Sequence, residues 1–274
     1  MTISAVVHTY NEERNLPDCL ASLAFCDEIV VVDNESTDRT VELARAAGAR
    51  VAVFSGRHGY PEPARVFGLA QLTQDWVLIV DADERVTPEL RDELRRLDSD
   101  PGACDGYWVP IRNYHFGRWL RHGGLYPDLH LRFFRRGKGG YPEVGLHRGV
   151  AVDGPQGNLT GDLLHFSYRN LAHYFGKFNA YTDAEAERIV AQGRRPGGYD
   201  LLLKPWHRWL KAYVFKAGFR DGLAGFLFHA FSAAYVFASE LKAWETFSAR
   251  GEKLPVLATL FSRGRGRRQG EVSQ

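Results

Sequence analysis

The stretch Trp76-Val77-Leu78-Ile79-Val80-Asp81-Ala82-Asp83 joins a continuous apolar run to two carboxylates one residue apart. An apolar run of this length between polar neighbours is typical of a buried strand. Asp81 and Asp83 then lie at its carboxyl end, where open α/β sheets bind their ligands. Mg²⁺ and Mn²⁺ prefer carboxylate oxygens and commonly take one or two of them together with substrate phosphates. The D-x-D pair therefore predicts a metal-diphosphate site, with a turn or helix-cap role as the alternative.

A helix is predicted directly after this pair, and it carries its own start signal. Thr87 is suited to cap it and Pro88 to occupy its first position. Leucines at positions 90, 94 and 97 supply its apolar face. This helix needs neither aspartate as a cap, which favours a role in binding for the pair.

The residues before this stretch alternate between strand and helix patterns. Strands are expected at residues 3–7, 29–32, 49–54 and 76–80, and helices at 16–23, 41–47 and 64–72. This order predicts an α/β fold with a Rossmann-like, mostly parallel sheet flanked by helices, because parallel strands need crossover connections. The expected organisation is a catalytic domain over residues 1–170, a helical region over 171–250 and a basic flexible tail over 251–274.

The composition is that of an ordinary globular protein. The chain has 274 residues, 45% of them hydrophobic, and a formal net charge of +2, which is too small to indicate nucleic acid as a partner. Its three cysteines, Cys19, Cys26 and Cys104, form neither a metal-binding spacing nor a disulfide framework. The sequence opens with a predicted strand and has no secretory-signal pattern, so a cytoplasmic location is expected.

Polar residues also follow the first two predicted strands. Thr9-Tyr10-Asn11-Glu12-Glu13 comes after the first, and Asp33-Asn34-Glu35-Ser36-Thr37-Asp38 after the second. Tyr10 is suited to stack on a base and Asp33 to accept from a base or ribose, so the three strand ends together predict a nucleotide-diphosphate pocket. The alternative is that Asp33, Ser36 and Thr37 are turn and cap residues. The glycine-rich loops of dinucleotide-binding enzymes and P-loop NTPases are absent from the sequence.

The C-terminal part is helical in pattern and rich in aromatic residues. Residues 222–239 carry no charge, and as a helix they are about 27 Å long, just enough to cross a bilayer. We expect peripheral helices that lie on the membrane, the alternative being a helix buried against the catalytic domain or a partner subunit. The basic tail is either a solvated terminus or a lipid-facing patch. The expected interfacial anchors are Trp206, Trp209, Lys204, Lys211 and Lys216, and the tail contains Arg263, Arg265, Arg267 and Arg268.

Three of these segments resemble the opening motifs of family-2 glycosyltransferases with the GT-A fold. They are residues 7–12 (Val-His-Thr-Tyr-Asn-Glu), 31–38 (Val-Val-Asp-Asn-Glu-Ser-Thr-Asp) and 80–84 (Val-Asp-Ala-Asp-Glu). Downstream, residues 122–128, 131–136 and 164–168 resemble the bacterial branch that contains the lipopolysaccharide core β-glucosyltransferases. The resemblance extends over residues 2 to 247.

This resemblance implies an inverting, metal-dependent glycosyltransferase. It would move a hexose from a nucleotide-diphosphate-sugar to a lipid-linked or lipopolysaccharide-type glycan. The resemblance implies that the donor is a UDP-sugar. Asp81 and Asp83 would hold Mn²⁺ or Mg²⁺. The donor-binding residues implied are Thr9, Tyr10, Asn11, Glu12, Asp33, Arg65, Asp81, Ala82, Asp83 and Arg132.

The general base is sought in the segment around the arginine-rich stretch. Where the branch usually has His-Glu, this chain has His147-Arg148, so the expected carboxylate is absent. Glu143 and then Asp128 are the carboxylate candidates. His147 is a base, a metal ligand or a structural histidine.

Arginines downstream of the D-x-D pair are suited to neutralise a diphosphate, because guanidinium pairs well with phosphate oxygens. The candidates are Arg132, Arg135 and Arg136, although alternation along a strand prevents all three from facing the same side. Val66 follows Arg65 where the branch usually has Asn, which leaves the choice of donor open.

Two other function classes remain at this stage. A nucleotidyltransferase also uses an α/β sheet and a metal, but it normally opens with a glycine-rich phosphate loop, and residues 7–13 contain no glycine. A sugar-nucleotide binder with impaired catalysis is the other class, and Arg148 is the residue that favours it.

Overall fold

The computed structural model describes the chain except for residues 57–61, 98–103, 116, 142–148, 169–170 and 253–274. The described residues fall into two units, each with its own internal packing. Unit 1 comprises Met1–Arg121 and Leu125–Ser167, and unit 2 comprises His122–Gly124 and Tyr168–Gln274. The predicted candidates Glu143 and His147, the neighbouring Arg148 and the four tail arginines lie outside the described residues.

The first half of the sheet in unit 1 is parallel, as the strand-helix alternation predicts. Its strands lie side by side in the order β3-β2-β1-β4. In β1, Thr9 is in register with Asp33, and His8 is in register with Asp81. The polar residues that follow these three strands therefore share one edge. The bounds are β1 Ile3–Thr9, β2 Glu28–Asp33, β3 Arg50–Val53 and β4 Trp76–Asp81.

Beyond β4 the sheet becomes mixed. β8 pairs antiparallel with β4 and with β6, and the order continues β8-β6-β12-β5. The α/β prediction is confirmed, and these antiparallel strands are an addition to it. The bounds are β5 Glu84–Val86, β6 Gly106–His115, β7 Arg118–Trp119, β8 Asp128–Arg135, β11 Gln156–Asn158 and β12 Leu163–Tyr168, with a separate pair β9 Gly139–Gly140 and β10 Ala151–Val152.

The helices of unit 1 follow the strands at the predicted places. In α4 the cap works as predicted, because the Leu90 backbone N–H donates to Thr87 Oγ1 over 3.2 Å. The bounds are α1 Leu16–Ser22, α2 Thr40–Ala46, α3 Glu62–Ala70 and α4 Pro88–Arg96.

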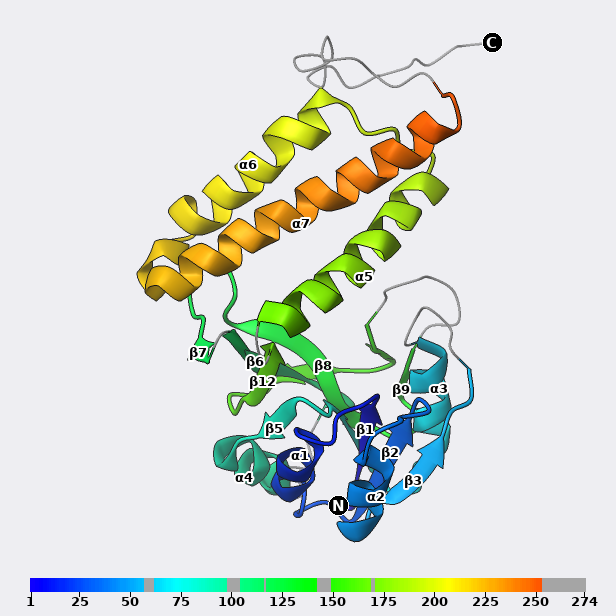
Figure 1. The fold of residues 1–274 in the computed structure, drawn as a ribbon. Helices are drawn as coiled ribbons and strands as arrows, with labels where there is room; N and C mark the ends of the chain where they lie inside the picture. Colours follow the sequence, from blue (N-terminus) through cyan, green and yellow to red (C-terminus); the bar gives the residue numbers. More distant parts are fainter. Residues whose placement is uncertain (57–61, 98–103, 116, 142–148, 169–170, 253–274) are drawn as a thin grey trace, which may run out of the picture. The chain divides into compact units, whose positions relative to one another are not determined.

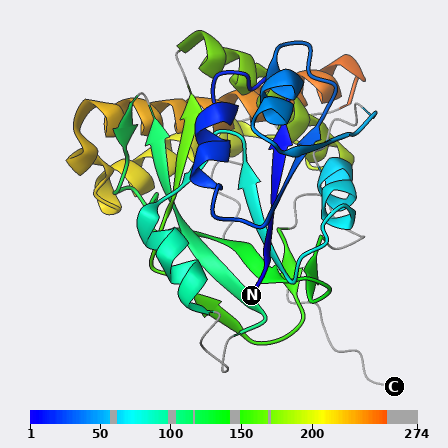
Figure 2. The same ribbon diagram turned by 90° about the horizontal axis from the view of Figure 1, so that it is seen from below.

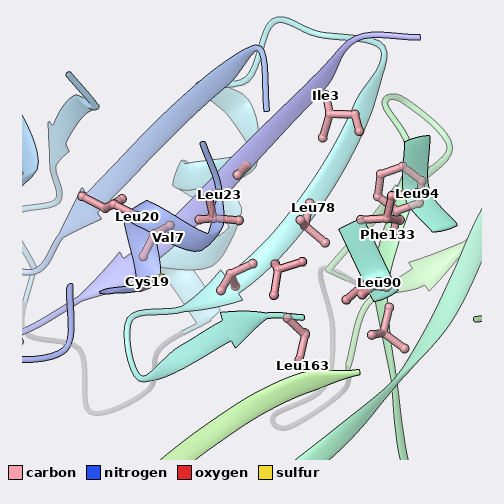
Figure 3. Close-up of a cluster of buried hydrophobic side chains, with 14 of the residues drawn as sticks. Ile3, Val7, Cys19, Leu20, Leu23, Leu78, Leu90, Leu94, Phe133 and Leu163 are labelled. Atoms are coloured by element: carbon pink, nitrogen blue, oxygen red, sulfur yellow. The ribbon is translucent and has the colours of Figure 1, made fainter. Parts of the chain in front are cut away.

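The two faces of the parallel strands build two apolar clusters. Val7 and Leu78 face the larger cluster, where α1 adds Leu20 and α4 adds Leu90 (Figure 3). Val6, Val30 and Val32 point to the other face of the sheet and belong to the second cluster. Because both faces are covered, the strands are apolar at successive positions, which explains the continuous runs in the sequence. Each fully buried side chain of this size contributes about 1.5–3 kcal/mol.

Unit 2 is helical. Its helix α7 contacts both α5 and α6, and the ribbon views show the three running beside one another (Figures 1 and 2). An ion cluster with buried carboxylates joins them: Arg194 lies 2.7 and 2.8 Å from the Glu240 oxygens and 3.1 Å from Asp200. Lys204 also donates to Glu240, so this predicted membrane anchor has a partner within the protein. The bounds are α5 Leu171–Ala191, η2 Tyr199–Leu203, α6 Lys204–Trp209, η3 Leu210–Phe215, η4 Gly218–Asp221 and α7 Gly222–Ala249.

Candidate functional site

The ends of β1 and β2 are tied together by a buried carboxylate. Asp33 Oδ1 accepts from Thr9 Oγ1 over 3.0 Å and from Ser36 Oγ over 2.5 Å, and its Oδ2 accepts from the Ser36 backbone N–H over 2.8 Å. Only 1% of Asp33 is exposed, and Thr9 is buried as well. Asp33 therefore organises the loop, which agrees with the turn-and-cap alternative.

The loop after β1 is held against the loop after β2. Asn11 has φ 55°, and its backbone N–H donates to Ser36 Oγ over 2.9 Å while its side-chain oxygen accepts from the Thr37 N–H over 2.8 Å. The Glu12 N–H donates to Thr40 Oγ1 over 2.8 Å. These contacts leave the ring of Tyr10, 43% exposed, at the edge where a flat ligand can stack.

The third strand end carries a cluster of opposite charges. Arg132 on β8 places its Nη2 3.1 Å from Asp81 Oδ2 and 2.8 Å from Glu84 Oε1. The other oxygen of Glu84 accepts from the Asp81 backbone N–H over 2.8 Å. Arg65 on α3 lies 3.8 Å from Asp81 Oδ1. The first carboxylate of the D-x-D pair is therefore held between two guanidinium groups.

Burial and pairing separate the two acids of this cluster. Burial opposes ionisation of Asp81, but Arg132 and Arg65 outweigh it and hold the pKa of Asp81 well below its usual range. For Glu84 burial prevails over the attraction of Arg132 and raises its pKa. Burial opposes the charge on Arg132, yet Glu84 and Asp81 together raise its pKa above the usual range. Arg132 and ionised Asp81 are thus a fixed pair.

Unused hydrogen-bonding capacity surrounds Asp81. Within the part of the chain that the structure describes, the buried Nε atoms of Arg65 and Arg132 and both ring nitrogens of His8 have no hydrogen-bond partner. Burial lowers the pKa of His8 to about 4, so its ring is neutral at physiological pH. The close approach of α3 depends on Gly68, where a Cβ would lie 2.9 Å from Val32 Cγ2 and 3.0 Å from His8 Nε2. Two guanidinium groups with spare donors are suited to an anionic ligand such as a diphosphate.

The second carboxylate of the pair, Asp83, leads into a different network. Its Oδ2 lies 3.6 Å from His165 Nε2 on β12. His165 Nδ1 donates to Asn113 Oδ1 over 2.7 Å, and Asn113 Nδ2 donates to Asp128 Oδ2 over 2.9 Å. His130 Nε2 lies 3.0 Å from the other oxygen of Asp128. One path thus connects the D-x-D pair with the predicted base Asp128.

The His165 tautomer follows from this path. Because the Asn113 amide must donate to the Asp128 carboxylate, its oxygen faces His165 and the proton of a neutral ring is on Nδ1. The Nε2 lone pair then faces an Asp83 oxygen, with the Ser167 hydroxyl 3.4 Å from Nε2, and a cation between the lone pair and the carboxylate would remove their repulsion. A proton supplies one, since burial opposes the charged ring but Asp83, Glu84 and Asp81 raise the pKa of His165.

A divalent ion would also fit between Asp83 and His165. The Asp83 carboxylate and the His165 imidazole supply donor atoms of the kinds that bind divalent ions. Across the described residues, no group of three or more His, Cys, Asp and Glu side chains is arranged to hold a metal. The available donor set is therefore a pair, which suits an ion that shares its other positions between water and a substrate phosphate.

Some predicted residues lie elsewhere, and others were not anticipated. Arg135 stacks over Trp76 and pairs with Asp105, and Arg136 Nε donates to the Gln74 carbonyl, so only Arg132 of the three candidate arginines pairs with Asp81 among the described residues. Ala82 is buried, so its side chain is not exposed for contact with a ligand. Four further residues of the site, His8, Glu84, Asn113 and His165, were not among the predicted site residues; His8, Glu84 and His165 lie inside the motifs at residues 7–12, 80–84 and 164–168.

Comparisons with known proteins show the family of this chain. Residues 4–151 match the family model described as glycosyl transferase family 2. The chain is 34% identical over 251 residues to the lipopolysaccharide core biosynthesis glycosyltransferase LpsC of Rhizobium meliloti, covering 89% of this chain and 93% of LpsC.

Two solved structures are similar at a lower level. One is S. aureus TarS (residues 1–349) in complex with UDP-GlcNAc, with 17% identity, a TM-score of 0.47 and coverage of 92% of this chain and 93% of that one. The other is glucosyl-3-phosphoglycerate synthase from Mycobacterium tuberculosis with Mn²⁺, UDP and glucosyl-3-phosphoglycerate, with 25% identity, a TM-score of 0.31 and coverage of 42% and 44%.

Proposed function

Because the chain belongs to glycosyl transferase family 2, we propose that it transfers a hexose from a nucleoside-diphosphate sugar, UDP-linked, to a glycan acceptor of the lipopolysaccharide core type. The observation that carries the proposal is the placement of Asp83 and His165 beside the Arg65–Asp81–Arg132 cluster at adjoining strand ends. This arrangement offers ligands for a divalent ion next to two cations for a diphosphate.

The donor is bound through its two ends. Arg65 and Arg132 would bind the diphosphate by donating hydrogen bonds from their guanidinium groups to its oxygens. The exposed ring of Tyr10 would stack on the base, and the backbone of residues 9–12, held by Ser36 and Thr40, would line the ribose. Asp33 contributes by fixing this loop.

The reaction we propose is an inverting displacement at the anomeric carbon. The acceptor hydroxyl attacks from the face opposite the diphosphate, loses a proton and forms the new bond as the diphosphate leaves. Asp83 and His165, with Asp81 adjacent, would hold Mn²⁺ or Mg²⁺, which would supply a Lewis acid for the leaving group. Arg65 and Arg132 stabilise the same developing charge from the protein side.

Asp128 is the general base that we assign among the described residues. It is half-exposed, and Asn113 and His130 hold one oxygen each, so its orientation is fixed. Burial favours the neutral acid, but the hydrogen bonds from His130 and Asn113 outweigh it and lower the pKa of Asp128. Asp128 is therefore ionised at neutral pH, which is the form that a general base requires.

The similarity to LpsC supports an acceptor in lipopolysaccharide core assembly. The protein would meet its donor in the cytoplasm, where the free cysteines of the protein remain reduced.

Calorimetric titration with a panel of nucleoside diphosphates, with and without Mn²⁺, tests the donor assignment. We expect wild type to bind one nucleotide in a metal-dependent manner and Asp83→Asn to lose that dependence. Asp92→Asn is the matched control, because Asp92 is an exposed aspartate on α4 that pairs with the neighbouring Arg91. No binding to any nucleotide, or unchanged metal dependence in Asp83→Asn, would contradict the proposal.

Transfer is tested separately with a UDP-hexose panel and deacylated core oligosaccharides. Formation of a β-linked product from an α-linked donor is expected, together with its loss in Asp128→Asn. Binding without transfer to any acceptor would favour the impaired sugar-nucleotide binder instead.

A further inference from the structure

We propose that the face of unit 2 formed by α6, η3, η4 and the first half of α7 docks on an anionic lipid bilayer. We call it the docking face. The bilayer is a binding partner of the protein. The inference rests on the proposed function only in one respect: docking would bring the enzyme to a lipid-linked acceptor. Its physical basis is independent of the donor site.

The docking face leaves large apolar side chains uncovered. Helix α7 belongs to a 32-residue helical stretch, Gly218–Ala249, that is apolar enough to cross a membrane by composition, yet only 17% of its most apolar window is buried. Phe215 is 77% exposed and Leu223 73% exposed. Exposing side chains of this size to water costs about 1.5–3 kcal/mol each relative to burial, which a lipid environment would recover.

An apolar groove continues from these residues. It has a volume of about 700 Å³ and lies between η2–α6 and α7, where Leu202, Trp206, Trp209, Phe226 and Phe237 line it. Trp206 stacks on Trp209 with ring centroids 5.3 Å apart, and Trp209 stacks on Tyr213 at 4.8 Å. Stacking holds these rings in place, and Trp and Tyr are the residues enriched at the membrane-water interface.

The exposed charges beside this groove are positive. Between Leu201 and Arg220 the sequence has five Lys and Arg residues and no Asp or Glu. Lys204 is paired with Glu240, and Arg208 donates to Ser232, which leaves Lys211, Lys216 and Arg220 exposed at the end of the face that carries Phe215.

The acids that flank this segment do not offset the cations at the surface. Asp200 is buried and paired with Arg194, and Asp221 is buried and paired with His122. Cations beside exposed aromatic and aliphatic side chains are complementary to the phosphates and acyl chains of an anionic membrane surface.

The packing of α7 favours lying on the bilayer over crossing it. Glu240 follows the uncharged window and is held by Arg194 and Lys204, and Lys242 pairs with Asp183 on α5 at 2.6 Å. A spanning α7 would have to break these pairs or draw the charged side chains of α5 into hydrocarbon. A helix group that inserts only one face keeps all of them.

Cosedimentation of the full chain with vesicles tests the inference. The probes are vesicles of phosphatidylcholine alone and of phosphatidylcholine with phosphatidylglycerol in equal parts. We expect the wild type to pellet with the mixed vesicles and to remain in solution with the neutral ones. The double variant Phe215→Ser/Leu223→Ser and the double variant Lys211→Glu/Arg220→Glu should each lower the partition coefficient at least about tenfold.

Matched controls come from unit 1. Val53→Ser removes an exposed apolar side chain, and Lys138→Glu reverses an exposed charge, and both should pellet like the wild type. Wild type that stays in solution with both vesicles, or variants that bind as well as the wild type, would overturn the inference. Self-association through the same face, seen as a dimer in sedimentation equilibrium that the Phe215→Ser/Leu223→Ser variant abolishes, would replace it if vesicle binding is absent.

The calorimetric donor titration separates this inference from the proposed function. All docking-face variants should bind nucleotide as the wild type does. If nucleotide binding fails while vesicle binding follows the expected pattern, the proposed function is wrong and the docking face stands.

Discussion

Nη2 of Arg132 lies 3.1 Å from Oδ2 of Asp81, although the two residues belong to antiparallel strands 51 positions apart. This contact makes the first carboxylate of the D-x-D pair part of an ion cluster that also includes the buried Glu84. Asp83 is then the carboxylate closer to the histidine on β12. The two aspartates therefore have different environments despite their identical chemistry.

Replacement of Arg132 by Met should destabilise the protein strongly. Glu84 is 1% exposed and would lose its cation, and breaking a buried pair in this way costs about 3–5 kcal/mol. Urea unfolding followed by tryptophan fluorescence measures the loss. Arg91→Met, which removes an exposed pair with Asp92, should cost no more than about 1 kcal/mol. Equal unfolding midpoints for the two variants would contradict the cluster.

Replacement of Asn113 by Ala should weaken metal binding. Asn113 fixes the His165 tautomer, and the loss of such a supporting hydrogen bond typically costs about 10–100-fold in metal affinity. The readout is the Mn²⁺ concentration that supports half-maximal nucleotide binding. Asn158→Ala, on the exposed strand β11, is the control. An unchanged Mn²⁺ requirement in Asn113→Ala would show that His165 is not positioned for a metal.

Acidification should lower the stability of the protein through His115. Burial lowers the pKa of His115 from 6.5 to about 3, and the charge of His165 adds to this effect. The unfolded chain therefore binds the proton more readily, so stability is complete above the unfolded pKa and falls as the pH drops below it. The expected loss between about pH 7.5 and about pH 5 is roughly 2 kcal/mol.

The variant His115→Phe isolates this contribution, since the phenyl ring fills a similar volume and does not titrate. Its free energy of unfolding should fall less steeply with acidification than that of the wild type. Parallel pH profiles for the two proteins would mean that His115 is not the responsible group.

Two glycines with positive φ should respond differently to Ala. Gly123 has φ +73°, and a Cβ there would lie 2.1 Å from His229 Nε2, whereas Gly48 has φ +80° and nothing within 4 Å. Gly48→Ala should cost only the backbone strain of about 1–2 kcal/mol, and Gly123→Ala should add about 1–3 kcal/mol for overpacking. Thermal unfolding compares them.

The double variant Gly123→Ala/His229→Ala tests the cause. Removing the imidazole opens the space for the new methyl group, so the two substitutions should be less destabilising together than the sum of their separate effects. Additive effects would place the strain of Gly123→Ala in the backbone alone.

Much of the parallel half of the sheet was predictable because its signals are local. A strand buried on both faces must be apolar at every position, and residues 29–32 and 76–80 meet that demand directly. The antiparallel half was less predictable, since β6 combines Pro110, Arg112 and Asn113 with apolar residues and matches neither pattern. Its place is set by pairing with β8, a partner distant in the sequence.

The sequence by itself determined that polar groups follow three adjacent parallel strands, because strand order and polarity are encoded within short windows. Only the tertiary structure decided which of those groups pair with one another. Asp33 is buried and hydrogen-bonded within its loop, Asp81 pairs with Arg132, and Asp83 lies beside His165. These outcomes depend on which side chains approach within a few ångströms across strands, and electrostatic energy at that range is set by spatial distance and burial rather than by separation along the chain.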